Sequence, residues 1–286
     1  MRTLAHTILF FLLIASPAFA QAPLGAVALH QAVLDMRTDL RLMCVAAHPD
    51  DEDGATLAYY RMHEGIKTFT VVATRGEGGQ NEIGPELYND LAVIRTHEMA
   101  DASTVTGAEL HFLDLPEFGF SKSSEETFAV WGREEPVRRL VRVIRETRPD
   151  VIITNHDTTH GHGHHQAIGI ALIEAFDAAA DPTHFPEQIT EGLQPWQPRR
   201  LLVRQWEAAS ADASVNIYAF DSARGMTYAE VAAEALRRHR SQGMQFFIDR
   251  YTNRTVTALY YTVKETVSPV QDNDLFRGIP DRVTPE

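Results

Sequence analysis

Short apolar runs along the chain alternate with longer segments whose apolar residues recur at helical spacing. The runs are rich in strand-forming residues and lie at 40–47, 68–74, 110–113 and 151–154. The segments with apolar residues three and four positions apart lie at 55–64, 91–105, 136–147 and 165–179. Such spacing is typical of helices with one buried face. The pattern therefore predicts strands and helices in alternation.

Strands that are apolar throughout are typical of a parallel sheet whose two faces are both covered. We therefore predict an α/β fold, a Rossmann-like and mostly parallel sheet with helices on both faces. Two late strands are expected at 201–203 and 215–220, followed by one long helix at 228–247. Because no repeat or clear linker is visible, residues 21–286 are predicted to form a single domain. Its Pro- and Asp-rich tail, after about residue 268, is expected to be loose.

The first twenty residues have the pattern of a secretory signal peptide. Arg2 precedes a compact apolar run at 8–14, and Ala18-Phe19-Ala20 is a small-x-small cleavage site. The run is too short to cross a bilayer as a helix, and no later run is a candidate membrane span. A buried N-terminal helix is the alternative interpretation. We expect an exported protein, either periplasmic or extracellular.

Charge and cysteine content exclude several classes of protein. The chain has 286 residues, with 39 acidic against 26 basic side chains and a net charge of -13. This balance argues against nucleic acid or an anionic membrane as partner, since both select for basic surfaces. One cysteine, Cys44, rules out an intrachain disulfide framework. The thirteen histidines stand out, because several of them cluster.

Polar, chemically active residues follow the predicted strands at their carboxyl ends. The segments 48–52, 75–81 and 155–165 come directly after the runs at 40–47, 68–74 and 151–154. In an open parallel sheet these ends meet at one edge, where ligands bind. Residues more than a hundred positions apart are therefore predicted to share one site.

Three of these residues are a candidate metal set. His48 and Asp51 are three positions apart across a turn that opens a helix, so both can face one ion. His165 is the best third ligand, because it lies on the same face of its helix as the buried apolar residues. His164 points about a quarter-turn away from that face. Three protein ligands and one open position are typical of catalytic zinc, and Fe²⁺ suits the same donors.

Two neighbouring residues are candidates for catalysis. Asp50 lies beside a ligand and is well placed to act as a general base. His162, three residues before His165, could in protonated form stabilise an oxyanion or give a proton to the leaving amine. Two simpler interpretations remain open: the acidic run 50–53 as a helix cap only, and the histidine-rich loop as a solvated surface.

The segment Ala47-His48-Pro49-Asp50-Asp51-Glu52 resembles the signature of the PIG-L/LmbE-like zinc N-deacetylases. The family's second motif, Gly-His-x-x-His, is similar to the segment 161–165. The resemblance covers about residues 40–173 and implies an LmbE-like fold. It also implies zinc on His48, Asp51 and His165, with Asp50 as base and His162 as the electrostatic or acid histidine.

Weaker similarities give candidate substrate-binding residues. Arg95, in an Arg-x-x-Glu pattern, resembles the family's substrate-contacting arginine, and Glu77 follows the second strand as in the family, next to Arg75. The segment 235–242 resembles a late helix of the family, which makes His239 and Gln242 candidates as well.

The resemblance implies metal-assisted amide hydrolysis. We expect the removal of an acyl group, most simply acetyl, from a small-molecule or glycan N-acyl substrate. A thiol-conjugate amidase is one alternative, although the leader-like N-terminus argues against it. A noncatalytic carbohydrate-binding module that retains the metal pocket is the other, although it would need neither Asp50 nor His162.

Overall fold

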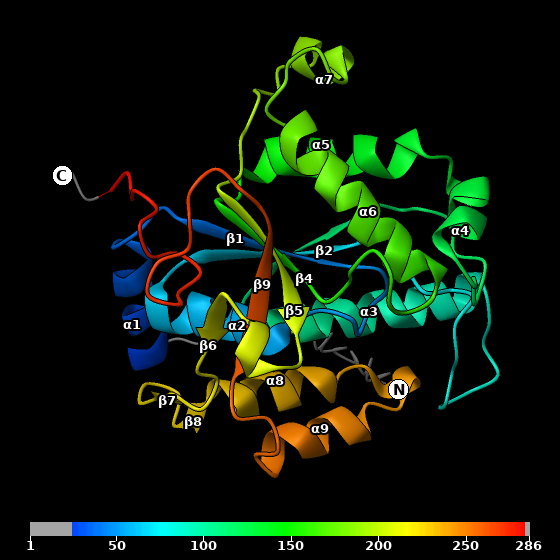
Figure 1. Cartoon of the computed structure of the whole chain (residues 1–286). Coiled ribbons are helices and arrows are strands. Elements are labelled where there is room, and N and C mark those ends of the chain that lie inside the picture. The colour runs from blue at the N-terminus through cyan, green and yellow to red at the C-terminus, as the bar shows by residue number, and fades with distance from the viewer. Residues whose placement is uncertain (1–24, 284–286) are drawn as a thin grey trace, which may run out of the picture.

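A computed structural model describes residues 25–283, so the predicted signal peptide at 1–20 lies outside the described residues. Seven strands form one sheet in the order β3-β2-β1-β4-β5-β9-β6 (Figure 1). Their bounds are Arg41–Ala46 (β1), Lys67–Val72 (β2), Glu109–Phe112 (β3), Val151–Thr154 (β4), Arg200–Gln205 (β5), Ala213–Val215 (β6) and Leu259–Thr266 (β9). The strands from β3 to β5 are parallel, whereas β9 runs antiparallel to both β5 and β6. The predicted mostly parallel sheet is confirmed.

Helices cover both faces of the sheet, with α5 and α6 on one side and α2, α3 and α8 on the other (Figure 1). Their bounds are Ala26–Asp35 (α1), Gly54–Tyr59 (α2), Asn89–Thr106 (α3), Ser124–Trp131 (α4), Glu134–Thr147 (α5), Gly163–Ala178 (α6), Pro186–Thr190 (α7), Tyr228–Leu236 (α8) and Gln245–Thr252 (α9). A π-helical turn at Tyr60–Glu64 extends α2, and two short strands, β7 (Phe220–Asp221) and β8 (Met226–Thr227), form a separate hairpin. No helix among residues 25–283 has the length and apolar character needed to cross a bilayer.

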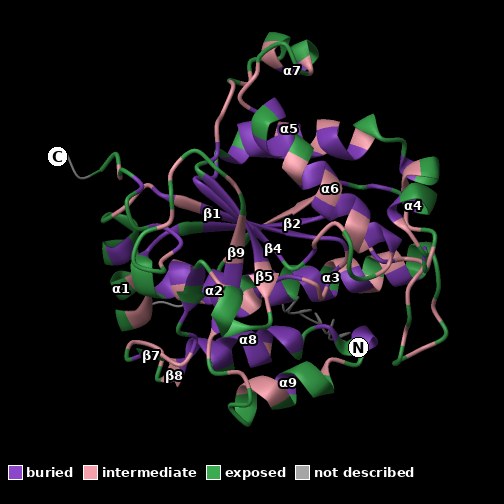
Figure 2. Cartoon of the chain, in the orientation of Figure 1, coloured by how far each residue is buried: buried purple, intermediate pink, exposed green. Residues whose placement is uncertain are grey.

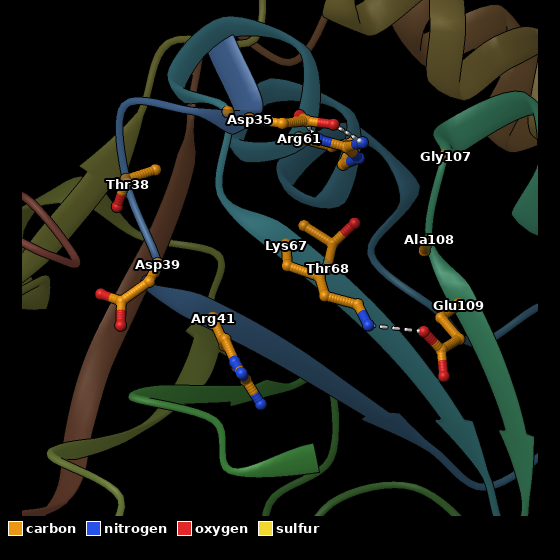
Figure 3. Close-up of a pocket in the computed structure, with 11 residues that line it drawn as sticks. Asp35, Thr38, Asp39, Arg41, Arg61, Lys67, Thr68, Gly107, Ala108 and Glu109 are labelled. Atoms are coloured by element: carbon orange, nitrogen blue, oxygen red, sulfur yellow. Dashed lines mark hydrogen bonds and ion pairs between the residues drawn. The ribbon is translucent and has the colours of Figure 1, made fainter. Parts of the chain in front are cut away.

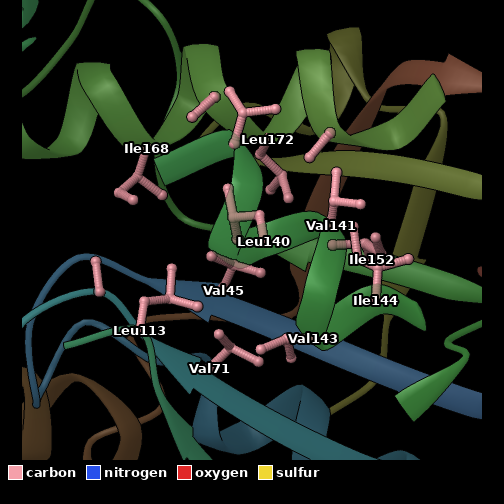
Figure 4. Packing of buried hydrophobic residues seen from close by; sticks show 14 of the residues in the cluster. Val45, Val71, Leu113, Leu140, Val141, Val143, Ile144, Ile152, Ile168 and Leu172 are labelled. Atoms are coloured by element: carbon pink, nitrogen blue, oxygen red, sulfur yellow. The ribbon is translucent and has the colours of Figure 1, made fainter. Parts of the chain in front are cut away.

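Each central strand contributes to two hydrophobic cores, because successive side chains point to opposite faces. In β1, Met43 and Val45 pack with α5 and α6, as the close-up in Figure 4 shows for Val45 beside Leu140. Leu42 and Cys44 pack on the other face, toward α2 and α8. The middle of the sheet is accordingly buried from both sides (Figure 2).

Two predicted elements in the C-terminal third are wrong. Instead of one helix at 228–247, α8 ends at Leu236, a 3₁₀ turn follows at Arg240–Gln242, and α9 begins at Gln245. Gly243 separates the last two with a φ of 64°, a left-handed conformation that interrupts a helix. The strand expected at 215–220 ends at Val215, because the Asn216 side chain accepts a hydrogen bond from the Tyr218 N–H and closes a turn.

The tail after residue 268, expected to be loose, is packed onto the domain. The buried guanidinium of Arg200 donates hydrogen bonds of 2.5–2.7 Å to the carbonyl oxygens of Ser268, Pro269, Leu275 and Arg277. Three apolar side chains of the tail join the core below the sheet: Leu275, Phe276 and Ile279. The tail lacks regular structure, so one arginine supplies the donors that a strand or helix would otherwise provide.

A pocket of about 480 Å³ lies at the amino ends of β1, β2 and β3, the edge of the sheet opposite the predicted site (Figure 3). Its charged groups are largely paired with one another. Lys67 contacts Glu109 at 2.9 Å, and Arg61 contacts Asp35. This pocket therefore offers little free charge to a ligand.

Arg200→Ala should lower the free energy of unfolding by about 3–5 kcal/mol, because four buried carbonyl groups lose charged donors. Chemical denaturation measures the loss, and hydrogen exchange should report faster exchange within 268–283. Arg199→Ala is the matched control, since Arg199 is the exposed neighbour. Equal stability of the two variants would show that Arg200 does not hold the tail.

Candidate active site

The loops after β1 and β4 lie side by side, because the two strands are direct neighbours in the sheet. From β1 the chain adds β2 and then β3 on one side of β1, and afterwards adds β4 on its other side. The point between β1 and β4 where the strand order reverses is where α/β sheets open a crevice for ligands. Two pockets meet at this edge. Asp50, Asp51 and His165 line both of them.

The four acidic residues 50–53 have four different environments. Asp53 is the N-cap of α2 and accepts a hydrogen bond from the Thr56 N–H. Helix capping therefore accounts for Asp53 but not for the other three acidic residues. Glu52 is buried and contacts His239 at 2.8 Å. The carboxylates of Asp50 and Asp51 remain at the pocket edge and are available for chemistry.

The predicted metal set is brought together around the Asp51 carboxylate. Asp51 Oδ2 lies 2.9 Å from His48 Nδ1 and 3.3 Å from His165 Nε2. Two ligands of one tetrahedral zinc ion lie about 3.3 Å apart, given zinc–nitrogen distances near 2 Å. Asp51 is therefore close enough to share an ion with either imidazole, although these three residues together are not one of the sets whose donor atoms all lie within 4.8 Å of one another.

Other residues also approach this centre. Sets of three donor atoms close enough for one ion are His48–His162–His165, His48–Glu117–His164 and Asp51–His156–His165. His156 Nε2 already accepts a hydrogen bond from the Ala47 N–H at 2.9 Å, so that nitrogen cannot also bind a metal. The choice of Asp51 with His48 and His165 stays a prediction, with His162 as the neighbouring donor.

Glu117, which the sequence analysis did not identify, supports His48 from behind. Its Oε2 lies 3.3 Å from His48 Nε2 and accepts a hydrogen bond from the Thr74 hydroxyl at 2.9 Å, while the Gly119 N–H donates to Oε1. These contacts with His48 and the Gly119 N–H lower the pKa of Glu117 to about 2, against its burial. A carboxylate on the second nitrogen of a metal-binding histidine fixes its tautomer and ring orientation.

His164 is fully buried rather than turned away from the site. Its Nδ1 lies 3.0 Å from His48 Nε2, and its ring stacks on Trp131. Although His164 lies about a quarter-turn from the buried face of α6, its imidazole is long enough to reach His48.

Asp50 is held at the edge of the pocket by Arg95. The Arg95 guanidinium donates hydrogen bonds to Asp50 Oδ1 at 3.2 Å and to the carbonyl oxygens of Pro49 and Gly76. Burial raises the pKa of Asp50 to about 7, and the neighbouring Asp51 charge acts in the same direction. Asp50 also has a φ of 108°, which is rare for a residue with a side chain and is found mainly at functional sites.

His162 is the N-cap of α6 and lines the same pocket as Asp50. Its ring centre lies 4.1 Å from that of His165 and 5.0 Å from that of His48. Burial and the charges of these two histidines lower the pKa of His162 to about 4. The lowered pKa favours a neutral imidazole, which can donate one N–H, and the role of His162 stays a prediction.

The five predicted substrate-binding residues take different places. Arg95 and Gln242 line the pocket, although the Gln242 amide already bonds to Gln80 and Ser241. His239 is buried behind Glu52, away from the pocket lining, and so acts at most through that carboxylate.

Arg75 and Glu77 are absent from the lining of both pockets at this edge. Arg75 contacts Asp114 and Thr96 instead. The family pattern placed both residues after the second strand, but that loop turns its glycines and Gln80 toward the pocket.

We expect the protein to bind one Zn²⁺ per chain. His165→Ala should weaken zinc binding by at least a hundredfold, because the metal loses one of its three protein ligands. Calorimetry or competition with a chromophoric chelator measures the affinity. His160→Ala is the control, since the His160 ring is exposed and pairs with Asp157. Equal affinity of the two variants would exclude His165 as a ligand.

Glu117→Gln should weaken zinc binding about 10–100-fold without removing the site, because His48 loses the carboxylate that orients it. The same competition assay applies. Glu125→Gln, on the exposed surface of α4, is the control. Unchanged affinity would assign Glu117 a structural role only.

Residues 43–176 match the family model described as "PIG-L: GlcNAc-PI de-N-acetylase". A mycothiol S-conjugate amidase of Streptomyces coelicolor is 33% identical over 187 residues, which are 59% of this chain and 62% of that protein. A 1D-myo-inositol 2-acetamido-2-deoxy-alpha-D-glucopyranoside deacetylase of Catenulispora acidiphila is 36% identical over 170 residues, or 51% of each chain. The chain thus spans less than two thirds of the length of these relatives.

Two solved structures share the fold. The N,N'-diacetylchitobiose deacetylase of Pyrococcus horikoshii has a TM-score of 0.59 at 20% identity and covers 82% of this chain and 90% of its own. The 4-carboxy-2-hydroxymuconate hydratase of Pseudomonas putida has the same TM-score at 15% identity and covers 82% and 99%. The signature 47–52 and the histidine motif 161–165, which meet at one edge of the sheet, both lie within the residues 43–176 that match the PIG-L family model.

Proposed function

We propose that the protein is a metal-dependent amidohydrolase that removes an acyl group from an N-acylated sugar or a related conjugate. The observation that carries the proposal is Asp50, a carboxylate held by Arg95 at the pocket edge beside the candidate metal ligands. A pocket that only binds a metal or a sugar needs no such group. The family match of residues 43–176 and the names of the two relatives support the same reaction class.

His48, Asp51 and His165 would hold the metal. A divalent metal bound there would polarise the acyl carbonyl and lower the pKa of a water molecule toward about 7. Asp50 accepts a proton from the attacking water as the oxygen bonds to the carbonyl carbon. The N–H of neutral His162 donates to the oxygen that becomes negative. The carbon–nitrogen bond then breaks, the amine takes the proton from Asp50, and a carboxylic acid is released.

The pocket that holds Asp50 and His162, which we call the polar cleft, suits a hydroxylated substrate. Its volume is about 390 Å³, and its lining includes Gln80, Gln242 and two backbone glycines, Gly78 and Gly79. A Cβ on Gly79 would lie 2.6 Å from the Arg95 guanidinium, so a larger residue there would displace the arginine that holds Asp50. Amide groups and exposed backbone provide the donors and acceptors that sugar hydroxyls require.

A thiol-conjugate amidase is the second candidate. The similarity to a mycothiol S-conjugate amidase favours this candidate, because the name of that protein describes cleavage of an amide in a thiol conjugate. The two candidates differ in the amine portion of the substrate rather than in the reacting groups. Export to the periplasm or the medium is part of the proposal and rests on the leader-like pattern of residues 1–20.

The purified protein with zinc should release acetate from N-acetylglucosamine-containing substrates, and a chelator should abolish the release. Asp50→Asn should lower kcat by at least a thousandfold while zinc stays bound, because asparagine tolerates the same backbone conformation but cannot accept the proton. Asp90→Asn, on the exposed start of α3, is the control. Full activity of Asp50→Asn would remove Asp50 from the mechanism. Release from a mycothiol conjugate alone would favour the amidase.

A further inference from the structure

A second pocket meets the polar cleft at the reaction centre and differs from it in chemistry. This pocket, which we call the apolar pocket, has a volume of about 320 Å³ and shares Asp50, Asp51 and His165 with the cleft. Beyond these residues its walls are mainly large apolar side chains. They are Trp206, Leu236, Met244, Phe247, Tyr251 and Val256.

These six apolar side chains come from elements outside the segment 43–176 that matches the family model. Trp206 follows β5, Leu236 ends α8, Phe247 lies on α9, and Val256 precedes β9. Trp206 is 69% exposed and Phe247 is 43% exposed, so large apolar surface remains open to solvent beside the reaction centre. Exposed apolar side chains gathered around a concave site are typical of a ligand pocket.

The two arginines of the apolar pocket are held against its walls. Arg204 is neutralised by Asp53 at 2.7 Å. Arg250 stacks on Trp206, with its guanidinium carbon 5.3 Å from the ring centre. Among residues 25–283, Arg250 has no carboxylate within ion-pair distance, so it is the one lining cation that an acidic ligand could use.

An amide bond has two substituents, and the two pockets offer one environment for each. The polar cleft supplies amides and backbone groups, whereas the apolar pocket supplies aromatic and aliphatic side chains. The methyl group of an acetyl substrate would leave most of the apolar pocket filled with water. Burying an acyl chain there would instead remove apolar surface of both partners from solvent.

We propose that the apolar pocket binds the acyl chain of the substrate and that this chain is considerably longer than acetyl. The hydroxylated amine portion occupies the polar cleft, and the scissile amide lies between the two at Asp50 and Asp51. The assignment of the acyl chain to the apolar pocket and of the amine to the polar cleft rests on the proposed amide hydrolysis. The preference of the apolar pocket for an aliphatic chain is independent of that reaction.

The first test measures kcat/KM for N-acetyl-, N-butanoyl-, N-hexanoyl- and N-octanoylglucosamine with the zinc-loaded protein. We expect a rise of at least tenfold from acetyl to octanoyl. Phe247→Ala should remove most of this rise while leaving turnover of the acetyl substrate within about twofold. Phe246→Ala is the matched control, because Phe246 is the neighbouring residue on α9, is more exposed and does not line the apolar pocket.

The second test measures binding of the same compounds to the Asp50→Asn protein by calorimetry, with and without Phe247→Ala. Binding of N-octanoylglucosamine at least tenfold tighter than the acetyl compound, and dependent on Phe247, supports the apolar pocket even if no amide is hydrolysed. If the protein binds the octanoyl compound in this way but hydrolyses no amide, only the proposed function fails. Equal affinity for all chain lengths overturns the inference. Tighter binding of N-glutaryl- than of N-hexanoylglucosamine also overturns it, because an acidic group would then be held by Arg250.

Discussion

The parallel pairing of β1 with β4 is the constraint on which the site depends. Their register sets Val45 opposite Thr154, and the Thr154 hydroxyl donates to the Val45 carbonyl oxygen at 2.8 Å. Two residues further along both strands, the Ala47 N–H donates to His156. These bonds fix the loop that begins at His48 against the loop that leads to α6. Candidate ligands separated by more than a hundred residues can therefore lie at one edge of the sheet.

Buried polar contacts then fix each reacting group, at a cost in desolvation that the fold must offset. Glu117 lies behind His48, Arg95 behind Asp50, and Glu52 accepts a hydrogen bond from the Asp50 N–H. Glu52 in turn contacts His239. The residues that hold the site thus come from α3, from the loop after β3 and from the segment after α8, as well as from the two motifs.

The strands, the two motifs and their common edge could be predicted from the sequence, because buried parallel strands leave long apolar runs and their carboxyl ends must meet. Glu117 lies in the loop after β3 and is a single acidic residue without a motif, so only its distance from His48 identifies it. The break between the 3₁₀ turn and α9 lies at Gly243, whose left-handed backbone a periodicity argument does not include. Strand β9 was missed although Leu259, Tyr261 and Val263 alternate with less apolar residues. The tail could not be predicted, because its packing depends on Arg200, a charged residue inside a strand.

The six apolar side chains that line the apolar pocket all lie outside the segment 43–176, which carries the signature and the residues Asp50, Asp51 and His165 of the same pocket. Under the proposed function, the side chains that act on the amide and the apolar side chains that contact the acyl chain therefore come from different stretches of the chain. Substitutions at these six positions would change the shape of the apolar pocket and leave Asp50 and the candidate metal ligands in place. The same stretch also carries His239 and Gln242, which contact the site, so it could not be exchanged as a whole without affecting the site.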